Sequence, residues 1–370
     1  MPVVPRLAAA LAVAIAVSVA GRAAETPSPG PKSRQFARDY HDWQAILAEL
    51  ADLRARYRRS GATERTTIQA QWQERVASGR AMLEELISAA RQAFAEAPNA
   101  DPRVTDLLVG AAADWNLRDD YEKSLELGNF LMAKGCKDGR LVELTGIAAF
   151  AVGQFDAAET YLRQAQAGHQ LSPPAQSGLS QIGYYKEAWA KEKKVRQAEA
   201  KADDLPRVLL RTSKGDILLE LFENEAPNTG ANFLSLVEKG FYNGLVFHRV
   251  IPGFMAQGGD PNADGSGGPG YHIPAEFTKA EHRLHFRGSL AMGRSDPPDS
   301  AGSQFYLMFV PKKDLDGRYT VFGRMIQGFD VLAKLQRIDP DQPARVVPDK
   351  IREAKVVRKR PHEYAVKKAG

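Results

Sequence analysis

The segment that most constrains the fold of this chain is Val246 to Asp260, with the sequence VFHRVIPGFMAQGGD. β-Branched and aromatic residues predict a short strand at its start, and Pro252-Gly253 predicts a turn. Phe254 to Gln257 predicts a second strand before two glycines. We therefore expect a tight antiparallel hairpin, which belongs to a β-rich domain.

Arg249 lies in the middle of the first of these expected strands. On a two-residue period the side chains divide into two faces, which are Phe247, Arg249 and Ile251 on one side and Val246, His248 and Val250 on the other. The guanidinium is then flanked by apolar neighbours. A surface arginine on a half-exposed strand is the ordinary interpretation of such a pattern. The alternative is a functional arginine held beside an apolar surface.

The stretch FHRVIPGFMAQGGD resembles the signature of the cyclophilins, which are peptidyl-prolyl isomerases. The resemblance continues through the Gly-rich stretch Gly258 to Glu276, through Gly288 to Val310 with its GSLAM and AGSQFY segments, and through Leu315 to Arg324. Altogether it covers Leu205 to Arg360. It implies a closed antiparallel eight-stranded barrel with two helices and an active groove on the outer face, and it favours the functional interpretation of Arg249.

The hydrophobic pattern of this region also predicts a strand-rich, two-helix domain. The expected strands are 208–211, 216–222, 246–251, 254–257, 289–292, 304–310, 319–325 and 351–357. One expected helix is opened by 226–229, runs through Val237 and ends at Gly240, and a second, short helix is expected over 329–335. A hairpin turn at 212–215 joins the first two strands, because Gly215 suits a left-handed position. Phe233, Leu234 and Val237 are expected to cover one mouth of the barrel.

By the same resemblance, Arg249 is the expected catalytic residue, donating hydrogen bonds around the prolyl amide. The expected substrate-binding residues are Phe254, Met255, Tyr306 and Leu315 around the proline ring, Gln257 and Gln304 as amides, Gly293 and Arg294 beside the residue before proline, Tyr319, and His248 as a peripheral contact. Isomerisation of an X-Pro bond needs no nucleophile, metal or cofactor, so none is expected.

Five positions depart from the best-known members of the family. Tyr306 replaces Phe, Tyr319 stands where many members have His, Asp314 where many have Trp, Gly293 replaces Ala, and Arg294 replaces Asn. The arginine and the proline pocket survive these changes, so the resemblance still implies activity. The missing Trp argues against tight binding of cyclosporin.

Other uses of the same residues are less well supported. His272, His282 and His285 with Glu276 and Glu281 lack a metal-binding spacing, which favours solvated loop histidines. The glycines of 258–270 lack the Lys-Ser/Thr ending and following helix of a phosphate loop. Ser303 has no nearby His-acid arrangement that would indicate a nucleophile.

Residues 1–24 resemble a secretory signal: Arg6 precedes an apolar run from Leu7 to Val19, and small residues follow. An uncleaved membrane anchor is the alternative, although the run is shorter than the roughly 20 residues of a spanning helix. A short Pro-rich linker is expected at 25–35. Cys136 is the only cysteine, so no intramolecular disulfide is possible. We expect an exported protein of the bacterial periplasm or cell envelope, without stable membrane insertion after cleavage.

A helical domain is expected over residues 36–203, because Ala, Leu, Glu, Arg and Gln dominate and apolar residues recur at helical spacing. Two long helices should break near Ser60-Gly61. Tyr121 and Phe155 are 34 residues apart and begin similar patterns of small and aromatic residues, which predicts two tetratricopeptide-like repeats at about 105–138 and 139–172. A non-repetitive helical bundle is the alternative. The arginines of this domain are interleaved with acids, which argues against nucleic acid as a partner.

The 370 residues therefore predict a helical domain, an isomerase domain at 204–361 and a basic tail at 362–370. The expected partners are proline-containing polypeptides and a protein bound by the helical domain. We expect a peptidyl-prolyl isomerase that assists the folding of exported proteins. The alternative is a proline-peptide-binding chaperone or scaffold in which the helical domain has the main role.

Overall fold

The computed structural model of the protein describes residues 30–340 and 346–369. They form two compact units. Unit 1 holds the described residues up to 114 together with 123–145, and unit 2 holds 115–122 and the described residues from 146 onward. The expected signal at 1–24 and residues 25–29 of the expected linker lie outside the described residues. The expected domain boundary at residue 203 lies inside unit 2.

Unit 1 begins with a hairpin of two long helices, α2 (Pro31–Arg59) and α3 (Ala62–Glu96). The break at Ser60-Gly61 is as expected. Leu53 and Ile68 are buried near the end of the hairpin. The helix start expected at Phe36 was wrong by five residues, because Pro31 occupies the first helical turn, where its missing N–H costs nothing.

The helices that follow are α4 (Pro102–Leu117), α5 (Tyr121–Ala133), α6 (Arg140–Ala151), α7 (Phe155–Gly168) and α8 (Pro173–Ala202). Within unit 2, Gly146 of α6 lies against α7, where an added Cβ would come within 2.7 Å of the Leu162 side chain. Gly153 ends α6 at a φ of 81°.

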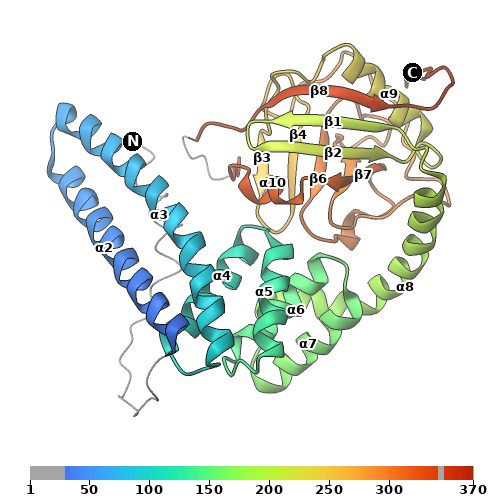
Figure 1. The fold of residues 1–370 in the computed structure, drawn as a ribbon. Coiled ribbons are helices and arrows are strands. Elements are labelled where there is room, and N and C mark those ends of the chain that lie inside the picture. Colours follow the sequence, from blue (N-terminus) through green and yellow to red (C-terminus); the bar gives the residue numbers. More distant parts are fainter. Residues whose placement is uncertain (1–29, 341–345, 370) are drawn as a thin grey trace. The chain divides into compact units, whose positions relative to one another are not determined.

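Unit 2 contains an eight-stranded antiparallel sheet in the order β3-β4-β6-β5-β7-β2-β1-β8 (Figure 1). Its strands are β1 (Arg207–Thr212), β2 (Gly215–Leu221), β3 (Arg249–Ile251), β4 (Met255–Gly258), β5 (Ser289–Met292), β6 (Phe305–Met308), β7 (Val321–Gln327) and β8 (Ile351–Arg358). Helices α9 (Pro227–Glu238) and α10 (Phe329–Lys334) and the short 3-10 helix η2 (Lys313–Leu315) complete the pattern.

The expected closure of the barrel was wrong, because the sheet is curled but its first and last strands do not pair. β3 is only three residues long. The chain just before it reaches the start of β8 through an isolated bridge between Val246 and Lys350, with a bond from Phe247 N–H to the Asp349 carbonyl. These contacts span the gap between β3 and β8 without forming a continuous ladder, which leaves a half-barrel.

Two apolar clusters lie on opposite faces of the central strands. In β6, Phe305 and Leu307 point into the main core, whereas Tyr306 and Met308 belong to a second cluster on the other face. Phe233 of α9 fills the main core, with its ring 5.6 Å from that of Phe305. Leu234 and Val237 of α9 lie in the same core. The second cluster forms the surface on which the candidate site is built.

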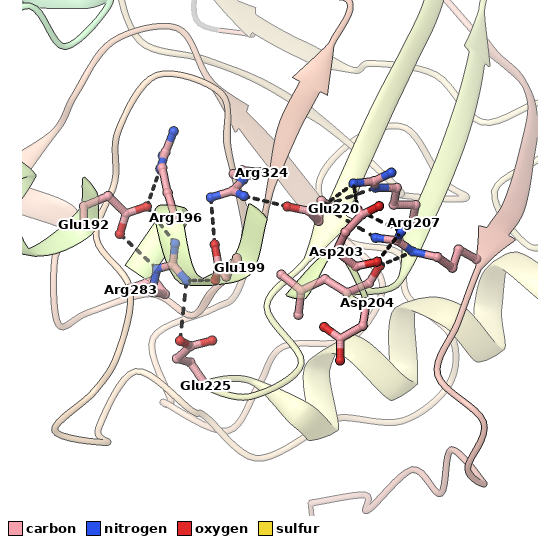
Figure 2. A network of polar contacts seen from close by, with 12 residues as sticks. Glu192, Arg196, Glu199, Asp203, Asp204, Arg207, Glu220, Glu225, Arg283 and Arg324 are labelled. Carbon is pink, nitrogen blue, oxygen red and sulfur yellow. Dashed lines mark hydrogen bonds and ion pairs between the residues drawn. The ribbon is translucent and has the colours of Figure 1, made fainter. Parts of the chain in front are cut away.

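Helix α8 is joined to the sheet by buried ion pairs (Figure 2). Glu192 accepts from Arg283 at 2.7 Å, and Glu199 bonds both Arg283 and Arg324, the latter at 2.8 Å. The Arg283 side chain is only 4% exposed, and its guanidinium lies 3.7 Å from the centre of the Phe222 ring. These contacts make α8 part of the same unit as the sheet.

The C-terminal tail is attached to unit 2 rather than being only a solvated end. Lys367 and Asn228 exchange two hydrogen bonds, and the Ala369 N–H donates to the His272 carbonyl at 2.8 Å. Tyr364 packs partly buried against the main core. In the part of the chain described, no helix combines the length and the apolar character needed to cross a membrane.

Candidate active site

The β3–β4 hairpin places Arg249 directly opposite Gln257 in the sheet. The turn between them is tight, with Gly253 at a φ of 65°. Arg249 is half-buried, and its guanidinium carbon lies 5.8 Å from the centre of the Phe254 ring. Among the described residues it makes no ion pair or side-chain hydrogen bond. Its donors are therefore available to a ligand.

The expected division of the side chains around Arg249 between two faces of the strand was partly wrong. Phe247 is fully buried and belongs to the main core, together with Val250. Regular strand geometry begins only at Arg249, so the two-residue alternation does not extend back to Phe247. Ile251, on the same side as Arg249, packs beside the second cluster as expected.

The floor of the candidate groove is apolar and firmly packed. Met255 is 1% exposed and Tyr306 is 5% exposed, and both belong to the second cluster. Phe254, Leu315 and Tyr319 lie partly buried against it. The rings of Tyr306 and Tyr319 meet nearly at right angles, with centres 6.1 Å apart. The structure thus brings together the four residues expected around the proline ring, with Tyr319 beside them.

The two glutamine side chains form a rigid pair at one end of the groove. Gln257 donates to the Gln304 side-chain oxygen at 2.9 Å. Gln304 in turn donates to the Gly265 and Gly267 carbonyls at 2.8 and 3.0 Å. Because the amide of Gln304 is committed to the Gly-rich loop, Gln257 is the better placed of the two to contact a substrate backbone.

Gly293 and Arg294 continue this edge of the groove. The Gly293 N–H donates to the Gln304 carbonyl at 2.8 Å, and an added Cβ would come within 3.3 Å of the Gln257 amide. Arg294 donates to the Arg318 carbonyl at 3.0 and 2.9 Å and lies 4.7 Å over the Tyr319 ring. Arg294 therefore packs against the Tyr319 ring and supports its position.

His248 is buried, with 9% of its surface exposed, and its Nδ1 atom has no hydrogen-bond partner among the described residues. Burial lowers the pKa of the ring, while the nearby Asp260 carboxylate opposes that shift. A neutral imidazole follows at neutral pH. The peripheral role expected for His248 stays a prediction.

His285 was expected among solvated loop histidines, and its place beside the candidate site was not predicted. The ring is completely buried, and its Nε2 atom lies 3.0 Å from the Tyr306 hydroxyl. The signal that could have found it is Tyr306 itself, because a buried phenol hydroxyl in place of the usual Phe needs a hydrogen-bond partner. The neighbouring Asp316 was also missed; its Oδ1 atom lies 2.8 Å from Nδ1 of His285.

These features define a class of site. An arginine with no ion pair or side-chain hydrogen bond among the described residues stands beside an apolar surface and a fixed amide. In the described ranges no group of three or more His, Cys, Asp and Glu side chains is arranged to hold a metal. Such a surface is suited to binding an extended peptide and stabilising a twisted amide, which is the chemistry of a prolyl isomerase.

Comparison with known proteins agrees with this class. The family model described as cyclophilin type peptidyl-prolyl cis-trans isomerase/CLD matches residues 207–356. A peptidyl-prolyl cis-trans isomerase of Helicobacter pylori is 44% identical over 150 residues, covering 39% of this chain and 91% of the relative. One from Synechococcus elongatus is 48% identical over 120 residues, covering 32% and 80%.

Among solved structures, a Cryptosporidium parvum cyclophilin type peptidyl-prolyl cis-trans isomerase crystallised in the presence of the dipeptide Ala-Pro is 32% identical, with a TM-score of 0.37 over 40% of this chain and 98% of that one. The present chain belongs to the cyclophilin-type peptidyl-prolyl cis-trans isomerases and is an enzyme of that activity. The helices before residue 207 lie outside the region matched by the family model.

Proposed function

We propose that this isomerase acts on X-Pro bonds of exported polypeptides and assists their folding, with Arg249 as the catalytic residue. The observation that carries the proposal is the Arg249 guanidinium, which has no ion pair or side-chain hydrogen bond among the described residues and stands beside the apolar surface of Met255, Tyr306 and Phe254. The proline ring would rest on this apolar floor, and Gln257 would hold the substrate backbone. Gly293, Arg294 and Tyr319 would flank the residue before proline.

The proposed chemistry is stabilisation of the twisted amide. The barrier to rotation is about 20 kcal/mol because the planar amide is conjugated. In the twisted state the conjugation is lost and the proline nitrogen becomes a better hydrogen-bond acceptor. A guanidinium held at the edge of an apolar groove would then bind the twisted state more strongly than either planar isomer. The rest of the groove would fix the ring while the carbonyl turns.

We also propose that residues 105–172 form two tetratricopeptide-like repeats. The support is a local geometry that recurs after 34 residues. α5 begins at Tyr121 and α7 at Phe155. The preceding turns contain Asp119 and Gly153, both at positive φ, and equivalent hydrogen bonds follow: Asp120 to the Trp115 carbonyl, and Gln154 to the Ala149 carbonyl, both at 2.8 Å. Such repeats commonly bind protein segments.

Export remains a proposal that rests on the sequence of residues 1–24. The periplasm or cell envelope suits an enzyme with one cysteine, whose stability needs no disulfide. A second candidate function is a chaperone or scaffold in which the helices bind the client and catalysis is incidental. The long helices α2 and α3, which lie outside the family match, favour keeping this candidate.

Refolding of an unfolded protein whose slow phase is proline isomerisation tests the proposal. The full chain should accelerate that phase, and Arg249→Ala should lose most of the acceleration. Arg352→Ala, at an exposed position on β8, is the matched control and should behave as the unaltered protein. If Arg249→Ala still assists refolding fully, for example by suppressing aggregation, the scaffold function replaces the proposed one.

A further inference from the structure

Behind the groove, four side chains form a continuous hydrogen-bonded chain within unit 2. The Tyr306 hydroxyl of β6 meets Nε2 of His285 at 3.0 Å. Nδ1 of His285 meets Oδ1 of Asp316 at 2.8 Å, and the Tyr184 hydroxyl of α8 donates to Oδ2 of Asp316 at 2.8 Å. A residue of the helical region is thereby connected to the floor of the isomerase groove.

The direction of each hydrogen bond follows from the chemistry of the groups. A carboxylate only accepts, so Nδ1 of His285 carries the proton and donates to Asp316. The backbone N–H of His285 donates to the same oxygen at 2.7 Å, which fixes the ring further. The remaining nitrogen, Nε2, must then accept the hydrogen bond of the Tyr306 hydroxyl. Asp316 thus selects the tautomer that holds Tyr306.

This arrangement determines how Tyr306 presents its ring. His285 and Tyr306 lie with their rings nearly parallel, at 9° and with centres 6.0 Å apart. The hydroxyl is bonded to a fully buried imidazole, whereas the ring contributes to the groove floor opposite Tyr319. The hydroxyl that distinguishes this chain from relatives with Phe is therefore satisfied behind the groove.

We propose that Tyr184 is a positioning residue for the isomerase, acting through Asp316 and His285 on Tyr306. Its hydroxyl supplies one of the three hydrogen bonds that orient the Asp316 carboxylate. Loss of that bond frees the carboxylate, loosens the imidazole and broadens the orientations of the Tyr306 ring. The inference rests on the proposed assignment of Tyr306 to the proline pocket.

The hydrogen bond between Tyr184 and Asp316 is not explained by the attachment of α8 to the sheet alone. Glu192 and Glu199 already join α8 to the sheet through buried pairs with Arg283 and Arg324. The Tyr184 ring also packs under the Lys313 ammonium, which lies 4.6 Å from its centre. Removing only the hydroxyl leaves these interactions in place, so its effect reports on the hydrogen-bonded chain.

A double-mutant cycle in the full chain tests the proposal by the isomerisation of an Ala-Pro peptide. Tyr184→Phe should lower kcat/KM by about fivefold, the factor expected for one ordinary hydrogen bond. In the Tyr306→Phe background the same change should alter kcat/KM by less than about twofold, because no hydroxyl remains to be positioned. Asp316→Asn is a second perturbation and should show the same dependence on Tyr306.

Tyr364→Phe is the matched control, because its hydroxyl also donates to a carboxylate, that of Glu223, at 2.8 Å. It should leave kcat/KM unchanged. An equal loss from Tyr184→Phe in both backgrounds would assign Tyr184 a merely structural role, and no loss in the unaltered background would also overturn the proposal. Failure of the groove assignment is distinguishable, since Arg249→Ala would then retain activity.

Discussion

The carboxylate of Asp119 accepts a hydrogen bond from the backbone N–H of Gly253, with 2.7 Å between Oδ1 and N. Gly253 is in the turn between Arg249 and Phe254, and Asp119 is in the turn between helices α4 and α5. The other oxygen of Asp119 pairs with Arg337 at 2.7 Å. A residue far away in the sequence therefore holds the hairpin that carries Arg249, the proposed catalytic residue.

Replacing Asp119 with Asn should weaken both stability and activity. Asn accepts the left-handed backbone at this position, where φ is 64°, so the turn is retained. Arg337, whose side chain is 23% exposed, loses its ionic partner. We expect the free energy of unfolding, measured by urea denaturation, to fall by about 3 kcal/mol. We also expect kcat/KM on a prolyl peptide to fall.

Asp330→Asn is the control for this change, because Asp330 forms an exposed pair with Lys334 on α10. This change should lower the free energy of unfolding by less than about 1 kcal/mol. If the Asp119 variant were as stable and as active as this control, the Asp119 charge and its pair with Arg337 would have no role in holding the hairpin.

The buried pairs of α8 predict a second stability difference. Glu199→Gln removes the charge that faces both Arg283 and Arg324, whose side chains are 4% and 10% exposed. The free energy of unfolding should fall by about 3 kcal/mol, because two buried guanidiniums lose a shared partner. Glu353→Gln breaks the exposed pair with Arg211 and should cost under about 1 kcal/mol in the same urea experiment. Equal effects would contradict the burial argument.

The same pairs determine which fragment retains a stable sheet. A fragment that begins at residue 203 lacks Glu192 and Glu199, whereas one that begins at residue 146 retains both. We expect the shorter fragment to unfold at a lower urea concentration. Identical midpoints would show that α8 is dispensable for the stability of the sheet.

The pH dependence of stability follows from His285. Burial lowers its pKa below the ordinary value of about 6.5, although Asp316 opposes the shift. As the pH falls, the His285 ring of the unfolded chain therefore binds a proton before that of the folded chain. The stability that the buried neutral ring contributes is fully present above about pH 6.5 and is lost as the pH falls toward the folded pKa. The slope for one group is at most about 1.4 kcal/mol per pH unit.

His285→Gln should reduce this acid sensitivity, measured as the free energy of unfolding between about pH 7.5 and 5. His248, whose pKa is also lowered by burial, contributes with the same sign and should leave a residual slope. His282→Gln is the control, because that ring lies only partly buried on the loop before His285. A slope unchanged by His285→Gln would contradict the assignment.

Two glycines of the helical region provide a packing test. An added Cβ at Gly146 would come within 2.7 Å of Leu162 and 3.2 Å of Tyr161, so Gly146→Ala should destabilise the chain by about 1–3 kcal/mol. At Gly168, in α7, nothing lies within 4 Å of the added atom. Gly168→Ala should instead stabilise by about 0.5 kcal/mol. Thermal unfolding of the two variants should therefore shift in opposite directions.

Much of the fold was predictable because local patterns and tertiary packing agree. The helix break at Ser60-Gly61, the ending of α6 at Gly153 and the hairpin at Pro252-Gly253 all depend on residues whose backbone preferences are strong. The groove around Arg249 followed from a long resemblance rather than from periodicity. Where periodicity was used alone, at Phe247, it failed, because the strand is too short to impose its alternation.

The contacts that the sequence could not reveal are those between distant segments. Nothing local marks Asp119 as a partner of Gly253 or Tyr184 as a partner of Asp316, and nothing local shows that β3 and β8 do not pair. His285 was assigned to solvent because it lacks a metal-binding spacing and has no local signature of burial. Only the unusual hydroxyl of Tyr306 pointed toward it.

The most direct test of the account is the rate of cis-trans exchange in a short Ala-Pro peptide, measured by NMR with the full chain, Arg249→Ala and the control Arg352→Ala. Uncatalysed exchange takes roughly 10–100 s. We predict that the unaltered chain and the control accelerate exchange equally, while Arg249→Ala loses at least about 100-fold of that acceleration. Full acceleration by Arg249→Ala would contradict the proposed role of this arginine.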